Sequence, residues 1–345
     1  MKVCKRILAQ REMVYAVCPF RIGGSLHFLA ATESNGQCLF FSPPDWEASV
    51  VWDGPSGTMS MSQVPGSKSI LAIQEFFPVF RCESAGIVWA EPGDRPAEPW
   101  SIRRVIDLPF AHRIEVVDVG GMPHLVASSL CGGKSHRDDW SMSCSVYACR
   151  IPDDPSASWQ TKPVLEGVSK NHGMRVATID GFPTVLIAGG EGLFGIRIPE
   201  HPENEWTYEM FIDHETSDVY VADIDRDGEM EFVTIEPFHG DTLAIYKRIN
   251  GRLRKAFEMG VSFGHALWAG ELLGAPAILV GNRGGEKDLF MLRPKSGNPL
   301  DMVYEVIDSG VAPAQISVVP ERDSALIVSA NNGRGEVALY RVSES

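Results

Sequence analysis

The sequence has no apolar run long enough to cross a membrane as a helix, because no stretch approaches the ~18 consecutive apolar residues that such a span needs. Residues 1–8 contain no apolar core of the length found in signal peptides. No window of useful length shows the apolar spacing of an amphipathic helix. We therefore expect a cytoplasmic protein that is poor in helix and has no membrane partner.

The chain also lacks an excess of positive charge. It has 31 Lys and Arg against 45 Asp and Glu, which gives a net charge of −14. Because a nucleic-acid-binding surface needs basic residues to neutralise phosphates, we expect no nucleic-acid partner. The acidic residues are spread along the chain, and this favours a role in solubility over recognition of one cationic partner.

The sequence contains no Cys-x-x-Cys spacing, although it has seven cysteines. The odd count and their position inside strand-like segments, such as Ser145–Cys149, argue against a disulfide framework or a zinc site. We expect buried free thiols in a reducing compartment.

What the sequence does contain is an internal repeat, which decides the expected fold. Similar strand-like runs begin at Trp46, Trp100, Trp159 and Trp206, and Leu253 and Met302 open two further runs of the same kind. Each run is followed by an apolar segment, a turn with glycine, a second apolar segment, a Gly-rich loop and a third strand. Seven units of roughly 45 residues fill residues 1–345. The sequence therefore predicts a single all-β domain, a seven-bladed β-propeller with four antiparallel strands per blade.

The fourth unit and the two ends of the chain make this prediction specific. In the fourth unit we expect strands over 174–179, 184–188, 193–198 and 206–212, because β-branched residues alternate there between Gly, Pro and Asp turns. Val3–Leu8 resembles the outer strand of a unit, whereas the last unit stops near Val342 without one. We expect the N-terminal strand to complete the last blade and to remove an exposed sheet edge.

Three histidines occupy the same place in this repeat. Aligning the units on Gly121, Gly181 and Gly274 brings His112, His172 and His265 into register, and other units offer at this place Tyr15, Thr58, Ser217-Asp218 and Ala312-Pro313. Since equivalent positions of a closed ring of repeats face a common axis, we expect the three imidazoles to converge. Three nitrogen ligands can hold a catalytic divalent metal such as Zn, Mn, Fe or Ni. The alternative is that they are unrelated polar caps of strands.

The loops between the second and third strands are expected on the same face as these histidines. We predict catalytic roles for His239, Tyr15, Arg283 and His136, and substrate-binding roles for Lys134, Arg137, Glu191, Glu236, Asp241, Asn331 and Arg334. An imidazole beside Tyr15 or an arginine can remove a proton next to a carbonyl with or without a metal. The mixture of charges suits a small polyhydroxylated or anionic sugar.

A second candidate site is the acidic segment Asp223–Glu231. Carboxylates at alternating positions followed by Gly228 can wrap a hard cation, and both flanks are strand-like, so the segment is a hairpin of one blade. It resembles the calcium hairpins of FG-GAP (VCBS-like, integrin-like) propellers. That resemblance implies structural calcium at Asp223, Asp225, Asp227 and Glu231, although the family usually has Asp at the last position. The alternative is an acidic turn without metal.

The arrangement is also similar to carbohydrate-active propellers, namely polysaccharide lyases and the propeller of aldos-2-ulose dehydratase. This similarity implies a sugar lyase, dehydratase or isomerase that works by metal-assisted proton abstraction in a histidine-lined funnel. The alternative is a non-catalytic propeller scaffold that binds a protein or glycan partner. A fold of this kind does not by itself decide between them.

Overall fold

The computed structural model describes residues 1–78, 81–295 and 298–344. Their contacts divide the chain into two compact units, which we call unit 1 (Met1–Val17 with His214–Ser345) and unit 2 (Cys18–Asp213). Within the described residues the regular structure is β-strand, apart from one 3₁₀ turn at Asn332–Arg334. A helix with the length and apolar character needed to cross a membrane is not found among them.

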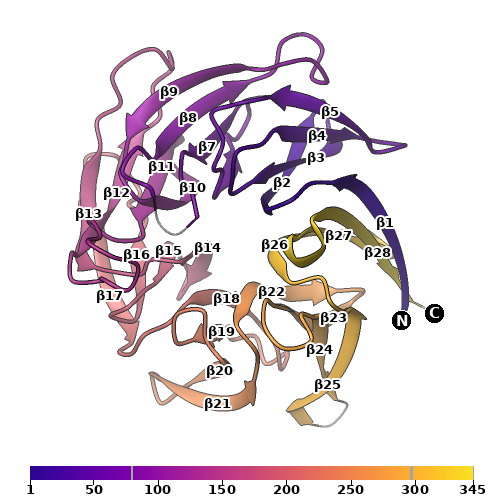
Figure 1. The fold of residues 1–345 in the computed structure, drawn as a ribbon. Coiled ribbons are helices and arrows are strands. Elements are labelled where there is room, and N and C mark those ends of the chain that lie inside the picture. The colour runs from indigo at the N-terminus through magenta and orange to yellow at the C-terminus, as the bar shows by residue number, and fades with distance from the viewer. Residues whose placement is uncertain (79–80, 296–297, 345) are drawn as a thin grey trace. The chain divides into compact units, whose positions relative to one another are not determined.

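The strands of unit 2 form four-stranded antiparallel sheets from consecutive segments, coloured indigo to pink in Figure 1. The first sheet begins with β2, whose first residues belong to unit 1. The sheets consist of β2 (Val14–Ile22), β3 (Ser25–Thr32), β4 (Cys38–Ser42) and β5 (Glu47–Trp52); β6 (Met61–Gln63), β7 (Ile70–Gln74), β8 (Gly86–Glu91) and β9 (Ser101–Asp107); β10 (Ala111–Val119), β11 (Met122–Ser129), β12 (Cys144–Arg150) and β13 (Lys162–Val168); and β14 (Gly173–Ile179), β15 (Phe182–Ala188), β16 (Leu193–Arg197) and β17 (Thr207–Ile212).

Unit 1 contains two further sheets of consecutive strands and one that joins the two ends of the chain. They consist of β18 (Asp218–Ala222), β19 (Glu231–Glu236), β20 (Thr242–Ile249) and β21 (Arg252–Gly260); β22 (Gly264–Leu272), β23 (Ala275–Asn282), β24 (Leu289–Lys295) and β25 (Asn298–Asp308); and β26 (Pro313–Pro320), β27 (Ser324–Asn331), β28 (Glu336–Ser343) and β1 (Lys2–Gln10).

Each sheet is a propeller blade, and the fold class is the predicted all-β, seven-bladed propeller with four antiparallel strands per blade. The predicted closure is also confirmed. Strand β1 pairs antiparallel with β28 over the register Lys2↔Ser343 to Gln10↔Glu336, so the N-terminal strand completes the last blade (Figure 1). This pairing satisfies the backbone groups that the edge of β28 would otherwise expose. The organisation as a single domain stays a prediction.

Burial follows the position of a strand within its blade. In the fourth blade β15 is buried from Thr184 to Ala188, whereas the outer strand β17 is exposed from Thr207 to Met210. A strand covered on both faces needs an unbroken apolar run, and an outer strand does not. The apolar clusters lie between sheets, as where Val185 and Ile187 pack with Val126 and Val146.

The repeated tryptophans mark the outer strands, as predicted. Trp46, Trp100 and Trp206 directly precede β5, β9 and β17, and Trp159 lies shortly before β13. Trp100 is only 6% exposed. It packs on Phe20, Phe40 and Trp52, with ring centroids 5.3–6.1 Å away. These indoles are packing anchors of the blades.

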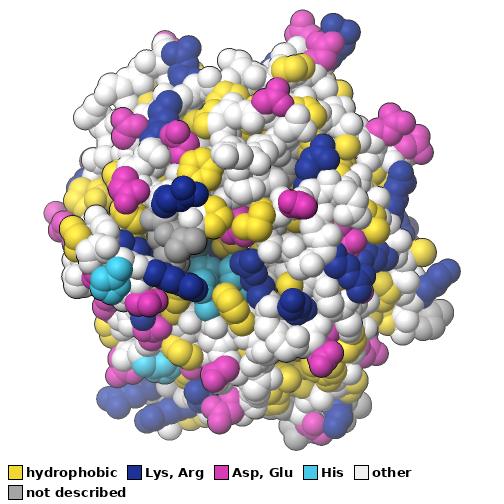
Figure 2. All heavy atoms as spheres, viewed as in Figure 1, with side chains coloured by type: hydrophobic (Ala, Val, Ile, Leu, Met, Phe, Trp, Pro, Cys, Tyr) yellow, Lys and Arg dark blue, Asp and Glu magenta, His cyan; other side chains and the backbone are white. Residues whose placement is uncertain are grey.

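Two expectations from composition also hold. All seven cysteines are free thiols, and five of them are buried. Acidic and basic side chains are interspersed over the face shown in Figure 2, which agrees with a dispersed net charge.

Candidate functional site

Several innermost strands begin with the same backbone pattern, which sets the direction of one side chain in each of these blades. A residue with left-handed φ lies two positions before that side chain, as in the pairs Met13 and Tyr15, Phe110 and His112, Lys170 and His172, Phe263 and His265, and Ala312 and Ala314. Positive φ is uncommon outside glycine. In addition, the ladders of β10 and β22 skip His112 and His265, so each is the extra residue of a β-bulge. Bulges re-aim side chains, and here the device repeats with the fold.

This pattern confirms the predicted register of the three histidines with Tyr15 and corrects it in two blades. In the last blade the ladder skips Ala314, which takes the place assigned to Ala312-Pro313. In the second blade the left-handed residue is Gly57, so the equivalent position is Met59 and not Thr58. Counting back from the turn glycines gives the wrong equivalent position in these two blades because the lengths of the innermost strands differ.

In unit 1 His265 has a defined orientation. Its Nδ1 lies 2.7 Å from the carbonyl oxygen of Ala314. A carbonyl can only accept, so Nδ1 carries the proton and Nε2 presents its lone pair. The hydroxyl of Tyr15 lies 3.5 Å from this Nε2. Tyr15 and His265 are 2% and 3% exposed, so this pair is shielded from bulk water.

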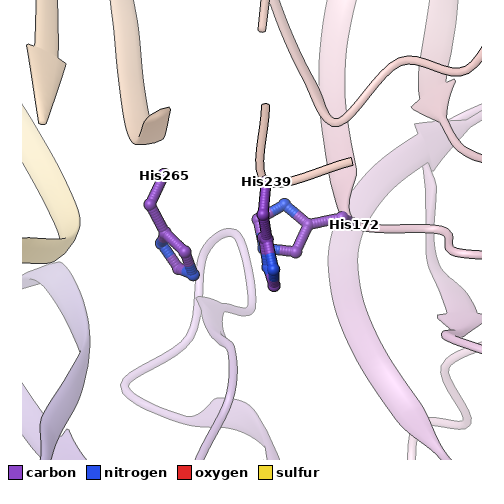
Figure 3. A group of neighbouring side chains, drawn as sticks. All are labelled: His172, His239 and His265. Carbon is purple, nitrogen blue, oxygen red and sulfur yellow. The ribbon is translucent and has the colours of Figure 1, made fainter. Parts of the chain in front are cut away.

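The ring of His239 extends this pair into a stack of aromatic faces. It stacks on Phe238, with centroids 3.9 Å apart, and on His265 at 5.1 Å. A ring nitrogen of His239 lies within 4.8 Å of one of His265 (Figure 3). Phe263 packs on His239 at 4.8 Å and is 39% exposed. The group therefore runs from the buried Tyr15 to an accessible aromatic edge.

Arg283 and Asn332 connect this group to the strand that carries Tyr15. Arg283 donates from Nη2 to Oδ1 of Asn332 at 3.0 Å, and its guanidinium lies 5.8 Å from the ring of Phe263. Asn332 in turn donates from Nδ2 to the carbonyl of Val14 at 3.0 Å. The structure thus brings the predicted residues Tyr15, His239, His265 and Arg283 together in unit 1. We call them, with Phe238, Phe263 and Asn332, the Tyr15–His265 site.

Sequence reasoning missed Phe238, Phe263 and Asn332. A signal for one of them was present, because Phe263-x-His265 repeats the spacing of Phe110-x-His112. Asn332 was missed by one position, since Asn331 was chosen instead. Asn331 is the last residue of β27 inside the blade, whereas Asn332 begins the 3₁₀ turn, so a slip of one residue exchanges a site residue for a core residue.

Unit 2 holds the other two histidines of the predicted register. The rings of His112 and His172 lie 5.0 Å apart, and Phe76 packs on His112 at 5.3 Å. Both histidines are buried, at 3% and 0% exposure. His172, also labelled in Figure 3, directly precedes β14 and donates its backbone N–H to Ala188. The prediction that His112, His172 and His265 bind one metal draws on both units and stays a prediction.

The remaining residues predicted in unit 2 serve their own loops. Lys134 donates to the carbonyls of Arg137 and Asp139, and its ammonium lies 3.2 Å from the centre of the Trp140 ring. Burial lowers the pKa of Lys134. His136 and Arg137 are exposed in the same loop.

Glu191 accepts hydrogen bonds from the backbone and hydroxyl of Ser169, at 2.7 and 2.8 Å. It therefore ties the middle loop of its blade to the segment that leads into His172. The substrate role of Glu191 stays a prediction.

Two residues predicted to bind substrate point into the interior of their blades. Glu236 is 6% exposed, accepts from Thr234 at 2.6 Å and lies 3.2 Å from Nε2 of His214. Asn331 is fully buried and donates to Glu336 and Tyr340, at 2.8 Å each. Their polar groups are used inside the protein, and the substrate roles of both residues stay predictions.

Asp241 and Arg334 are more peripheral. Asp241 accepts from the hydroxyl of Thr242 at 3.2 Å. Arg334 donates to the carbonyl of Ser309 at 2.6 Å and lies 3.9 Å from Asp308. These contacts do not involve His265, and the substrate roles of Asp241 and Arg334 stay predictions.

The predicted cation hairpin gathers its carboxylates but already contains a cation. Ligand oxygens of Asp223, Asp225 and Glu231 lie within 4.8 Å of one another. The ammonium of Lys247 bonds to Asp225 and to Asp227 and lies 3.8 Å from Oε1 of Glu231. Lys247 thus contacts the oxygens that calcium would bind, and calcium at this hairpin stays a prediction.

Sheet architecture and site together define the chain as a seven-bladed β-propeller with a buried His–Tyr pair. No family model matches the sequence, and no curated protein matches it, so membership of the FG-GAP family stays a prediction. Solved structures do match across almost the whole chain.

One of these structures is the Dos1 propeller, with 7% identity and a TM-score of 0.60, covering 95% of this chain and 77% of that one. A luciferin-regenerating enzyme matches with 8% identity and a TM-score of 0.50, covering 99% and 96%. A glucose dehydrogenase matches with 15% identity and a TM-score of 0.50, covering 99% and 100%. At these identities the similarity establishes the propeller fold.

Proposed function

We propose that this propeller is an enzyme that acts on a small sugar by acid–base chemistry at the Tyr15–His265 site, as a lyase, dehydratase or isomerase. The observation that carries the proposal is the hydrogen bond of His265 Nδ1 to Ala314, which leaves Nε2 as an acceptor beside the hydroxyl of Tyr15. A base of this kind, held in one tautomer and shielded from water, is suited to removing a proton next to a carbonyl.

The proposed steps use groups that are already in place. Nε2 of His265 accepts the proton from the carbon beside the carbonyl, and the C–H electrons form an enolate. The hydroxyl of Tyr15 donates a hydrogen bond to the enolate oxygen, and Arg283 pairs with a carboxylate or with hydroxyls of the substrate. For isomerisation, the hydroxyl proton on the deprotonated carbon passes to the former carbonyl oxygen and His265 returns its proton to the former carbonyl carbon. For elimination, the C–O bond to the β-hydroxyl or β-alkoxyl group breaks as the enolate re-forms the carbonyl, and the group leaves as water or alcohol with the proton that His265 carries.

The aromatic edge of the site supports a sugar as substrate. The faces of Phe238, His239 and Phe263 form an apolar surface beside polar groups, and pockets for small ligands combine these two features. The apolar C–H face of a sugar ring can pack on such a surface while its hydroxyls reach Arg283. The name of one structural neighbour, glucose dehydrogenase, is compatible with sugar chemistry on this fold.

Binding a divalent metal is the second role that Nε2 of His265 can take. A histidine that donates its other N–H to a carbonyl is oriented as metal-binding histidines are, so His265 fits a metal as a ligand. A metal bound through Nε2 of His265 would polarise the substrate carbonyl, and Tyr15 and His239 would then be left to move the proton. Elemental analysis separates the two roles. About one transition metal per chain, lost in His265→Ala, supports the metal.

The proposed reaction can be tested before its substrate is identified. Purified protein is incubated in D₂O with a panel of aldoses, ketoses, aldonates and uronates. NMR then detects deuterium entering beside the carbonyl, and ultraviolet absorbance detects a conjugated elimination product. We expect turnover with at least one sugar, reduced about 10²–10⁴-fold in His265→Gln. Tyr15→Phe should also be slowed.

The matched control is His201→Ala, an exposed histidine of unit 2 outside the site, which should turn over like the wild type. Activity that survives in His265→Gln would show that this site is not the catalytic one. If no sugar is turned over while the protein captures a specific glycan or protein, the non-catalytic scaffold replaces the enzyme.

A further inference from the structure

The hairpin between β18 and β19 holds a lysine ammonium in the middle of its carboxylates. Lys247 comes from the neighbouring strand β20. The ladder pairs Phe232 with Tyr246, so the next position along places Lys247 opposite Glu231. Its Nζ bonds to Asp225 and Asp227 and lies 3.8 Å from Glu231, and the side chain is 21% exposed.

The loop around this ammonium is ordered by its own backbone donors. Asp223 accepts from the N–H groups of Asp227 and Gly228, at 3.1 Å each. Oε2 of Glu231 accepts from the N–H of Ile224 at 2.7 Å. Arg226 and Gly228 both have positive φ, which lets the chain fold around the carboxylates. These backbone hydrogen bonds therefore hold the acidic side chains toward the inside of the loop.

Two of the inward oxygens have no hydrogen-bond donor and depend on a nearby positive charge. Oε1 of the fully buried Glu231 and Oδ1 of Asp225 are buried without a donor. An uncompensated buried carboxylate is costly.

We propose that Lys247 is the resident cation of this hairpin and takes the place of a calcium ion, so that the wild-type blade folds without metal and removal of the ammonium creates a calcium site. The oxygen donors present are those that calcium prefers. A covalently attached ammonium cannot dissociate, so one positive charge stays among these carboxylates at any calcium concentration.

The experiment compares wild type with Lys247→Ala, both dialysed against EDTA. Calcium binding is measured by isothermal titration calorimetry, and thermal unfolding is followed with and without millimolar calcium. We expect no calcium heat and no shift of the melting temperature for wild type. For Lys247→Ala we expect a lower melting temperature in EDTA, its recovery in calcium, and one site with a dissociation constant on the order of 10⁻³ M or tighter.

A matched control is Lys5→Ala. Lys5 also lies between two carboxylates, Asp308 at 2.7 Å and the buried Glu336, but no hairpin of alternating aspartates surrounds it. This variant should lose stability and should not recover it in calcium. The contrast separates a latent metal site from nonspecific screening of negative charge.

Two outcomes overturn the proposal. One is calcium binding by wild type that is lost in Asp223→Asn, which would make the hairpin an ordinary calcium site. The other is a folded Lys247→Ala that neither loses stability nor binds calcium. If Lys247→Ala does not fold in EDTA, refolding in millimolar calcium decides the question: rescue by calcium supports the proposal, and failure of rescue, with Lys247→Gln also unresponsive, contradicts it.

Discussion

The Nδ1 of His265 donates a hydrogen bond to the carbonyl of Ala314, 2.7 Å away, and both residues are the extra residues of equivalent bulges in neighbouring blades of unit 1. The repeat thus provides the side chain in β22 and the carbonyl that orients it in β26. A carbonyl at the same place in each blade is a property of the fold. Histidine at this place is a property of this sequence.

The first prediction concerns the tautomer of His265. Because Ala314 can only accept, the neutral imidazole should carry its proton on Nδ1 and leave Nε2 unprotonated. A long-range ¹H–¹⁵N NMR spectrum of the folded protein should show one nitrogen of each type for this ring. His265→Gln assigns the signals by removing them. Protonation at Nε2 with a bare Nδ1 would contradict both the hydrogen bond and the proposed base.

The second prediction concerns Gly240, which follows His239. A Cβ at this position would lie 2.0 Å from the carbonyl oxygen of Glu236, a backbone atom that cannot rotate away. We expect Gly240→Ala to cost about 1–3 kcal/mol of unfolding free energy by overpacking and to displace the ring of His239. Chemical denaturation measures the first effect and activity the second.

Gly260→Ala is the control for this change. Gly260 belongs to the same blade, and a Cβ there would meet no atom within 4 Å. Its unfolding free energy should stay within about 0.5 kcal/mol of wild type. Equal behaviour of the two variants would show that the loop of His239 tolerates a methyl group and is not fixed as tightly as described.

Much of the fold was predictable because it depends on patterns that repeat. Trp46, Trp100 and Trp206 stand at outer strands because large apolar rings suit one position of every blade, and repetition made that position visible. The role of β1 was predictable because the last unit lacked an outer strand. Both arguments need only a count of strands and an alternation of apolar residues.

The site was less predictable because it depends on single residues. Asn331 and Asn332 are adjacent in the sequence. Asn331 uses its side-chain amide for hydrogen bonds in the core, whereas Asn332 connects Arg283 to Val14. Lys247 was missed because its partners lie about twenty residues away, across a strand pairing. The spacing of Asp223, Asp225 and Asp227 indicates a cation but cannot say that the chain provides it.

The third prediction concerns thiol reactivity. Cys4 is exposed, whereas burial raises the pKa of Cys18 and Cys144 to about 12 and that of Cys149 to about 11. Only thiolates react rapidly with disulfide reagents. We expect one fast-reacting thiol in the folded protein near pH 8 and all seven in denaturant. Cys4→Ser should abolish the fast phase, and a fast phase that persists would place a second thiol at the surface.

The fourth prediction concerns the salt bridge by which β1 joins the last blade. Lys5 lies 2.7 Å from Asp308 and also contacts Glu336, and Tyr340 donates to Asp308 at 2.9 Å. Burial alone would raise the pKa of Asp308, but the hydrogen bonds from Lys5 and Tyr340 outweigh it and hold this pKa below its usual value. Folding therefore favours the charged carboxylate.

The sign of the pH dependence follows from this shift. A lowered folded-state pKa gives stability that is complete above the unfolded value, about 4, and is lost as the pH falls through the folded value.

We expect Lys5→Ala to cost about 1–3 kcal/mol at pH 7, less than a fully buried pair because Lys5 is 24% exposed. The cost should shrink as the pH falls below about 4 toward pH 3, because the unfolded chain then gains the proton that the folded wild type resists until its lowered pKa is reached. Denaturant titrations at the two pH values measure it, with the exposed Lys2→Ala of the same strand as control. A cost that is the same at both pH values would mean that Lys5 stabilises the closure of the last blade by packing and not by its charge.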